Sequence, residues 1–278
     1  MPDQINKIRS HVVMVNDGSG VLIQSALGNQ SYILTAKHVL ETEENSRQYY
    51  DIDKITVIKM NGDVIDLVRR VVSTDHDLAV LITSSELDSD LQIAVSKPER
   101  NKRVFYYGYP STRRNLEPRD QLREYLGRVN EIEDDRFSVT LDGRPGWGEV
   151  VGSSGGGIFV ELGGDIFLQG IESRVEGVVD REFHGKVICT PVAMIEKLLS
   201  ESGLDKIHPP SMTSFIGLVD KTFQCFAQAE DPDNLTFLLN QLHERGAKLS
   251  SAENMTPFAL YEKFKKKLLI RDCPEQNL

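Results

Sequence analysis

A segment near the middle of the chain, VVGSSGGGIFV at residues 150–160, combines residue types that could do chemistry. It places Ser153 and Ser154 among four glycines, between two apolar runs. Segments rich in glycine and serine usually serve as flexible linkers. The apolar flanks, however, have the composition of β-strands, and a linker seldom joins two strands of one sheet. The segment is therefore either a linker or a shaped loop that exposes a serine, and other parts of the chain must decide between the two.

Two further segments carry residues that would complete such a serine. In ILTAKHVL (33–40) an apolar run leads to His38, and in STDHDLAVL (73–81) Asp77 precedes an apolar run. Taken alone, a histidine of this kind is usually structural, and an aspartate at the start of a strand is usually a turn or cap residue. A serine hydroxyl, however, is a weak nucleophile until a base takes its proton, and a histidine oriented by a carboxylate is such a base. The three segments together therefore predict nucleophilic catalysis.

The elements that would position these residues are short β-strands. Six segments rich in Val, Ile and Leu precede residue 84, with turn residues at 17–20 and at Asn61-Gly62, and six more follow residue 102. We predict strands at 11–15, 20–26, 31–36, 54–60, 63–72 and 77–83, and then at 103–109, 123–132, 136–142, 157–162, 165–175 and 186–190.

The grouping of these strands predicts the fold class. No helical crossover separates the strands within either set, which favours antiparallel barrels over a parallel α/β sheet. We therefore predict a mostly β fold of two six-stranded antiparallel β-barrels, at about 10–83 and 103–190, within a domain that spans 1–205. The polar stretch at about 84–102 would connect the two barrels.

After Pro191 the apolar residues change to helical spacing. VAMIEKLLSES (192–202) predicts one helix, and three more are expected at about 212–229, 233–245 and 257–270. The last begins with Thr256-Pro257, an N-cap followed by a proline at the first helical position. We therefore predict a small α-helical C-terminal extension at 211–278.

Composition narrows the classes of partner. The net charge of −10 disfavours a nucleic-acid partner, because phosphate binding needs a basic face, and KFKKK (263–267) reads as the solvated face of a helix. No apolar run has the length of a secretory signal or of a membrane span, so we expect no membrane partner. The 3 widely spaced cysteines predict neither a disulfide framework nor a metal site. We therefore expect a cytoplasmic protein without a cofactor or metal.

With these residues in place, the chain resembles the trypsin-like serine peptidases of the chymotrypsin fold. It is most similar to the bacterial branch that includes the HtrA-type and glutamyl-endopeptidase-type enzymes. The resemblance covers about residues 10–200 and keeps the family's order of histidine, aspartate and serine. It rests on GSGVLI (18–23), TAKHV (35–39), DLAVL (77–81), YGYP (107–110), VGSSGGGIF (151–159), LQGIESRVEG (168–177) and ICTPV (188–192).

The resemblance implies a serine endopeptidase that cleaves protein or peptide substrates through an acyl-enzyme. Ser154 matches the family's nucleophile, His38 its general base and Asp77 the carboxylate that orients the histidine. Asp75 lies nearby in the sequence, but the family places its acid directly before LAVL. The resemblance also assigns the oxyanion hole to the backbone N–H groups of Gly152 and Ser154, which can converge because glycines keep side chains away.

One departure from the family bears on regulation. Ser153 stands where the animal digestive members carry an aspartate that pairs with a newly cut N-terminus. We therefore expect no activation by N-terminal trimming and look to the helical extension for control. That extension could dock a protein partner, such as a sensor or effector in stress or phage defence with a dedicated protein target, or it could be a cap that stabilises the second barrel.

Substrate specificity is less well determined by the residues. The resemblance lines the primary pocket with Gly148 and Glu149, with 173–175 (Ser173, Arg174 and Val175), and with about 185–187. Gly148 stands where trypsin has its aspartate; Glu149 could still favour a basic side chain, and Arg174 or Lys186 an acidic one, although all three could be solvated rim charges. Val175 could narrow the pocket. We expect a preference for a small-to-medium or basic residue.

Two further alternatives remain open. Ser173 matches a family position that donates a hydrogen bond to the catalytic aspartate and begins the strand that binds substrate, but it could equally be an ordinary barrel serine. The whole chain could also be an inactive or latent protease-fold module that binds a partner peptide. A phosphate-binding loop is disfavoured, because no lysine follows the glycines and no helix is expected there.

Overall fold

The computed structural model of the chain describes residues 2–25, 30–43, 46, 48–85, 87, 89, 91–94, 97–162, 165–175, 185–205 and 207. The chain divides into two compact units, 1–208 and 209–278. The described residues all belong to the first unit. The three helices predicted between 212 and 270, and the extension that would contain them, lie outside the described residues.

The first half of this unit is a six-stranded antiparallel sheet. All six predicted strands are present, although the fourth is much shorter than its apolar segment. The sheet order is β4-β1-β2-β3-β6-β5. The strands are β1 (Val12–Val15), β2 (Gly18–Gln24), β3 (Ser31–Thr35), β4 (Val57–Ile58), β5 (Leu67–Val72) and β6 (Ala79–Thr83).

Alternation along these strands gives the sheet two buried faces. Val13, Val15 and Ile33 belong to a core within the first barrel. Their neighbours Val12 and Leu34 belong to a second core, which also contains residues of the other sheet. Successive side chains of a strand point to opposite faces, so a run of apolar residues is needed where both faces are covered.

The second half is a seven-stranded sheet in the order β11-β8-β9-β10-β13-β12-β7, and an additional pairing between β11 and β12 closes six of its strands into a barrel. The predicted strands are again present. They are β8 (Arg103–Gly108), β9 (Arg123–Ile132), β10 (Phe137–Leu141), β11 (Gly157–Leu162), β12 (Asp165–Val175) and β13 (Lys186–Pro191). The predicted mostly β fold with two antiparallel barrels is confirmed.

Two elements were not predicted. The connection at 84–102 contains β7 (Gln92–Ile93), which pairs in parallel with β12 between the buried residues Leu91 and Ala94. The N-terminal segment forms helix α1 (Pro2–His11), which contacts β1, β2 and β12 and buries Ile8. Among the described residues, Ile8 of α1 and Leu91 of the connection belong to the core that contains residues of both sheets, and Ile93 packs against it.

The remaining helices are short, except for α4 (Val192–Glu201), which the helical spacing after Pro191 predicted. The others are η1 (Lys37–Leu40), η2 (Ile52–Lys54), η3 (Ser111–Arg113), α2 (Pro118–Gln121) and α3 (Trp147–Val150). In the part of the chain that the structure describes, no helix has the length and hydropathy needed to cross a membrane.

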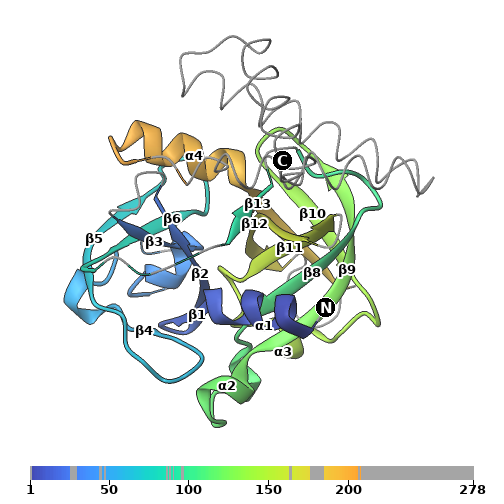
Figure 1. Cartoon of the computed structure of the whole chain (residues 1–278), viewed down its shortest axis with the longest axis horizontal. Helices are drawn as coiled ribbons and strands as arrows, with labels where there is room; N and C mark the ends of the chain where they lie inside the picture. Colours follow the sequence, from blue (N-terminus) through green and yellow to red (C-terminus); the bar gives the residue numbers. More distant parts are fainter. Residues whose placement is uncertain are drawn as a thin grey trace, which may run out of the picture. The chain divides into compact units, whose positions relative to one another are not determined.

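One core joins the two barrels. It contains Tyr32 and Leu78 from the first barrel together with Tyr107, Phe159 and Leu168 from the second. Figure 1 shows the first sheet in blue and teal at the left and the second in green to gold at the right. Segments that leave the two sheets at this junction can therefore meet, and the predicted site residues lie on such segments.

Candidate active site

The best-defined contact in the site is between His38 and Asp77. His38 lies in η1, directly after β3, and Asp77 lies just before β6, the neighbour of β3 in the sheet. The backbone N–H of His38 donates to Oδ1 of Asp77 at 3.0 Å, and Nδ1 of the ring lies 2.7 Å from Oδ2. With a proton on Nδ1 donated to the carboxylate, the lone pair of Nε2 is available to accept a proton.

The electrostatics of this pair favour its charged form. Partial burial lowers the pKa of His38, but the hydrogen bond and charge of Asp77, helped by Glu172 and Glu41, outweigh it and raise that pKa overall. Burial likewise raises the pKa of Asp77, but its bonds and charge interaction with His38 lower that pKa overall. The pair thus stabilises an imidazolium beside an ionised carboxylate, as a histidine that accepts a proton requires.

The segment at 150–160 is a shaped loop rather than a linker. Gly152 and Gly155 have φ of +85° and +89°, a backbone conformation that other residues seldom adopt. A Cβ atom at Gly155 would lie 2.0 Å from the carbonyl oxygen of Ser19, and one at Gly152 would lie 2.7 Å from the backbone nitrogen of Ser111. The glycines are therefore required by close backbone contacts.

Hydrogen bonds from both barrels hold the loop around Ser154. Ser19 of β2 donates its N–H to the carbonyl of Ser154 at 2.7 Å. On the other side, Gly155 donates to the carbonyl of Glu172 and Glu172 donates to the carbonyl of Gly156, both at 2.8 Å. The carbonyl and hydroxyl of Ser19 are also bound, by the Thr35 hydroxyl at 2.7 Å and the Tyr109 N–H at 2.8 Å. Ser19 therefore connects the first barrel to the backbone of Ser154.

These contacts bring Ser154 close to the histidine. A Cβ atom at Gly18 would lie 2.5 Å from the side chain of Val39, which follows His38, and 2.8 Å from the carbonyl oxygen of Ser154. Among the described residues, however, the hydrogen bonds of the His38 ring and amide both go to Asp77 and none reaches the Ser154 hydroxyl. Such a bond is often long without substrate and shortens when substrate binds.

The predicted oxyanion donors belong to peptide groups that are held from outside the loop. The N–H of Ser111 donates to the carbonyl of Val151 at 2.9 Å, and the Tyr106 hydroxyl lies 3.2 Å from the carbonyl oxygen of Ser153. Nη2 of Arg114 donates to the carbonyl of Gly152, in the peptide group between these two, at 3.3 Å. The C=O and N–H of one trans peptide point in opposite directions. Fixing the Val151 carbonyl therefore turns the Gly152 N–H the other way. Within the described residues, the N–H groups of Gly152 and Ser154 have no acceptor.

Arg114 is buried enough to serve as a fixed clamp for this loop. Besides Gly152, its guanidinium donates to the carbonyls of Asn16 at 2.9 Å and Tyr109 at 3.3 Å. Three backbone segments thus meet on one side chain. Sequence reasoning did not identify Arg114, because the residue lies beyond the recognised YGYP segment.

Glu172 is a second residue that sequence reasoning missed. Its side chain is only 1% exposed, next to Ser154, and the Tyr106 hydroxyl contacts its Oε2 at 3.3 Å, whereas Oε1 has no hydrogen-bond partner among the described residues. Burial raises the pKa of Glu172 to about 7, against the opposing effects of His38, Tyr106 and Ser154. The signal in the sequence was a charged residue inside the apolar segment 165–175.

The residues predicted to line the pocket are placed as follows. Glu149 is exposed, and its Oε2 accepts the N–H of Gly146 at 2.8 Å, so the carboxylate caps α3. Lys186 pairs with Glu131 at 2.7 Å. Arg174 is exposed near the end of β12, with Val175 half-buried beside it, and space is open around the Cα of Gly148. Residues 176–184 lie outside the described part of the chain.

Ser173 does not make the hydrogen bond to Asp77 that one interpretation expected. Its hydroxyl donates to the carbonyl of Ile188 at 3.0 Å. The pairing between β12 and β13 shifts register between Glu172 and Arg174, so Ser173 lies in a bulge. A bulge changes the direction of a side chain, which accounts for the different partner.

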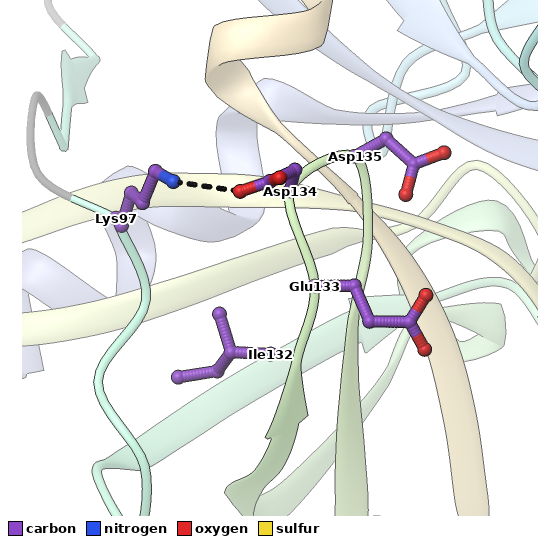
Figure 2. Close-up of a pocket in the computed structure, with 5 residues that line it drawn as sticks. All are labelled: Lys97, Ile132, Glu133, Asp134 and Asp135. Carbon is purple, nitrogen blue, oxygen red and sulfur yellow. Dashed lines mark hydrogen bonds and ion pairs between the residues drawn. The ribbon is translucent and has the colours of Figure 1, made fainter.

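A separate hollow of about 620 Å³ lies at the turn between β9 and β10, lined by Lys97, Ile132, Glu133, Asp134 and Asp135. Figure 2 shows Lys97 reaching Asp134, at 3.1 Å. Oδ2 of Asp135 lies 3.7 Å from Nδ1 of His76, the residue before Asp77. Among the described residues, no cluster of His, Cys, Asp and Glu could hold a metal ion.

Comparison with solved structures supports the fold. Kallikrein-related peptidase 10 in complex with Zn²⁺ is 15% identical, with a TM-score of 0.50, over 70% of this chain and 98% of that one. The inactive form of a mutant of Rv3671c from M. tuberculosis is 17% identical, with a TM-score of 0.49, over 72% of this chain and 89% of that one. At such identity the likeness to the kallikrein-related peptidase shows the fold alone.

Sequence comparison adds two family matches. No curated protein matches the chain. Residues 189–278 match C-terminal domain 4 of the ABC-three component (ABC-3C) systems, a match that begins within β13. The resemblance to the HtrA branch and the boundaries at 205 and 211 stay predictions. Residues 18–165, more than half of the chain, match the trypsin-like peptidase domain, and the chain therefore belongs to that family.

Proposed function

We propose that the chain is a serine endopeptidase that cleaves protein substrates with Ser154, His38 and Asp77. The observation that carries this proposal is the pair of hydrogen bonds between His38 and Asp77, at 3.0 and 2.7 Å. Two bonds from one carboxylate fix both the position of the ring and the nitrogen that keeps its lone pair. A histidine with only a structural role does not need this orientation.

The mechanism follows from these positions. Nε2 of His38 takes the proton of the Ser154 hydroxyl while Oγ attacks the carbonyl carbon of the scissile peptide. The N–H groups of Gly152 and Ser154 bind the oxyanion, and His38 then gives the proton to the departing amine. Water, deprotonated by His38, hydrolyses the acyl-enzyme and regenerates Ser154. Asp77 stays ionised throughout and stabilises the imidazolium.

Substrate would bind as an extended segment beside the end of β12. Residues 173–175 would pair with its backbone as an added strand. We infer a preference for a small-to-medium or basic residue at the cleavage site, since Val175 narrows this region and Glu149 leaves a negative charge near it. Cleavage of a peptide library tests the preference, and a dominant aromatic preference would contradict it.

The match of residues 189–278 to a C-terminal domain of ABC-3C systems supports a proposal about the system in which this activity operates. We infer that the chain works in the cytoplasm as part of a multi-component system, with a protein partner bound through the C-terminal region. A role in stress or phage defence against a dedicated protein target fits such an arrangement. Co-purification of the full chain with candidate components tests it, and loss of partner binding without loss of peptidase activity after deletion of 211–278 would assign docking to that region.

A second function is favoured by one specific observation. The Ser154 hydroxyl has no hydrogen bond to His38 among the described residues, whereas the buried carboxyl of Glu172 lies beside it. A latent or inactive module that binds a partner peptide in the same groove would have such a site.

Labelling by a fluorophosphonate probe separates the two functions. The probe reacts only with an activated serine, so the full-length chain should be labelled and its Ser154→Ala variant should not. Ser153→Ala is the matched control and should keep labelling. If the wild-type chain is not labelled, either alone or with candidate partners, the result would favour the binding module.

A further inference from the structure

The environment of Glu172 is unusual for a carboxyl group. It is 1% exposed, and no Lys or Arg neutralises it among the described residues. An isolated buried carboxylate is costly, and a glutamate at such a position usually has a function or is neutral. The titratable and polar groups that face it are His38 from η1, Asp77 from before β6, Tyr106 from β8, Cys189 from β13 and Ser154 from the loop.

Backbone hydrogen bonds place Glu172 beside the loop that carries Ser154. Glu172 exchanges hydrogen bonds with Gly155 and Gly156, the two residues that follow Ser154. The Ser154 hydroxyl is close enough to favour the charged form of the carboxyl group. Oε1, which has no hydrogen-bond partner among the described residues, is therefore an available acceptor for the Ser154 proton.

Tyr106 links the protonation of Glu172 to the same loop. Its hydroxyl, which carries one proton, lies 3.2 Å from the carbonyl oxygen of Ser153 and 3.3 Å from Oε2 of Glu172. Burial raises the pKa of Tyr106 far above its usual value, so that proton stays in place. A charged Glu172 must accept a hydrogen bond from the Tyr106 hydroxyl. A neutral Glu172 can instead donate its own proton to the Tyr106 oxygen, and the Tyr106 hydroxyl can then donate to the carbonyl of Ser153. The two states therefore differ in the bonds that reach the nucleophile loop.

We propose that Glu172 is a positioning residue for Ser154: when charged, its Oε1 accepts a hydrogen bond from the Ser154 hydroxyl and holds it away from His38, and when neutral it releases the hydroxyl. This inference rests on the function proposed above. Because a charged acceptor binds a hydroxyl more strongly than a neutral one, the diversion weakens when the carboxyl is protonated. The activity of the site would then fall as the pH rises past the titration of Glu172.

Two titrations would therefore shape the pH profile. Deprotonation of His38 supplies the base and raises the rate with pH, whereas ionisation of Glu172, with its pKa of about 7, lowers it. The two groups interact, so the observed limbs belong to the pair rather than to either residue. Removing the charge of Glu172 should abolish the falling limb alone.

The test is the rate of fluorophosphonate labelling of the full-length chain across the neutral range. Wild type should show a rise and a fall, and Glu172→Gln, which keeps the shape of the side chain, should show only the rise. At about pH 8.5 the variant should react roughly tenfold faster than wild type, and at about pH 6 the two should agree within about twofold. Glu161→Gln, an exposed change on β11, is the matched control and should behave as wild type.

Tyr106→Phe gives an independent second variant. It removes a donor that lowers the pKa of Glu172, so the falling limb should move to higher pH while the carboxyl remains. Circular dichroism verifies that each variant folds. If Glu172→Gln does not fold, the pH profile of Tyr106→Phe tests the role of Glu172 in its place.

The outcomes separate the two proposals. Labelling of Glu172→Gln but not of wild type at any pH would support the inference most strongly. Labelling of both with the same pH profile would overturn the role of Glu172 and leave the peptidase function standing. Labelling of neither would overturn the peptidase function, and the inference would fall with it.

Discussion

In the first barrel, His38 and Asp77 share two hydrogen bonds, whereas the second barrel places Ser154 beside buried groups that lack partners. Ser153 Oγ and Glu172 Oε1 are buried without a hydrogen bond among the described residues. Unpaired buried polar atoms are uncommon and call for an explanation. The proposed base is thus oriented by two hydrogen bonds, while the proposed nucleophile lies among contacts that can rearrange.

Removing the groups that react should have the largest effect and would test both barrels together. Ser154→Ala and His38→Ala should each lower peptide hydrolysis by about 10⁶-fold, and the double variant should be no worse, because the residues act as a unit. Initial rates with a cleavable peptide measure this. Substantial residual activity in Ser154→Ala, lost again on adding Ser153→Ala, would assign the chemistry to the neighbouring serine.

Replacing the proposed orienting carboxylate, Asp77, should have the second-largest effect on activity, and this change tests the first barrel alone. Asp77→Asn should lower kcat by about 10⁴-fold, because an amide can no longer hold the Nδ1 proton in place. Asp75→Asn is the matched control, since the Asp75 carboxylate accepts the hydroxyl of the neighbouring Thr74, at 3.0 Å, and has no bond to His38 among the described residues. Equal losses in the two variants would contradict the assignment of Asp77.

The clamp on the oxyanion loop tests the second barrel. Arg114→Met should lower kcat by about 10²-fold with little change in KM, the size expected when an oxyanion donor is displaced. Arg119→Met, on the exposed face of α2, is the control for the loss of one positive charge. A change confined to KM would show that Arg114 acts on substrate binding instead.

Glu172 should also affect stability in a pH-dependent way. Its pKa is raised to about 7 in the folded chain from a usual value of 4.5, so ionisation destabilises the fold progressively as the pH rises between these values. The cost at pH 8 should reach roughly 3 kcal/mol. Thermal melting should therefore show Glu172→Gln and wild type equal at about pH 4 and the variant more stable at pH 8. A gap that does not grow with pH would mean that the carboxyl is not buried as described.

Ser173 should have the smallest effect. Ser173→Ala removes the hydrogen bond to the carbonyl of Ile188 and should cost about 1 kcal/mol of unfolding free energy in a denaturant titration. Peptide hydrolysis should change less than about threefold, since this bond does not reach Asp77. A loss of 100-fold or more would restore the interpretation in which Ser173 supports the aspartate.

Strand positions were predictable because turn residues and β-branched runs alternate along both barrels. Asn61-Gly62 marks a turn, and the runs at 31–36 and 77–83 became β3 and β6 almost unchanged. The segment 54–60 became the two-residue β4 because only part of it pairs with β1. Helix α1 could not be recognised, since Ile8 is its one described residue in the main core and, apart from Pro2 and Ile5, the rest of its sequence is polar.

The site was predictable where a residue type is tied to a local pattern and not where it depends on pairing across the sheet. His38, Asp77 and Ser154 each follow or precede a distinctive apolar run. The direction of Ser173, in contrast, is set by a bulge between β12 and β13, and the carboxylate of Glu149 is held by an N–H group in the next turn. Burial of Glu172 likewise depends on three neighbouring segments that are distant in the sequence.

The bond between Ser19 and Ser154 has a consequence for synthesis of the chain. The proposed base and its carboxylate lie before residue 84, whereas the proposed nucleophile is synthesised only at residue 154, and its carbonyl then accepts an N–H group of the first barrel. A ribosome-bound chain therefore carries no assembled site until both barrels have emerged and docked. Neither barrel alone holds all three proposed residues, so the proposed activity would begin only after the whole of both barrels has been synthesised.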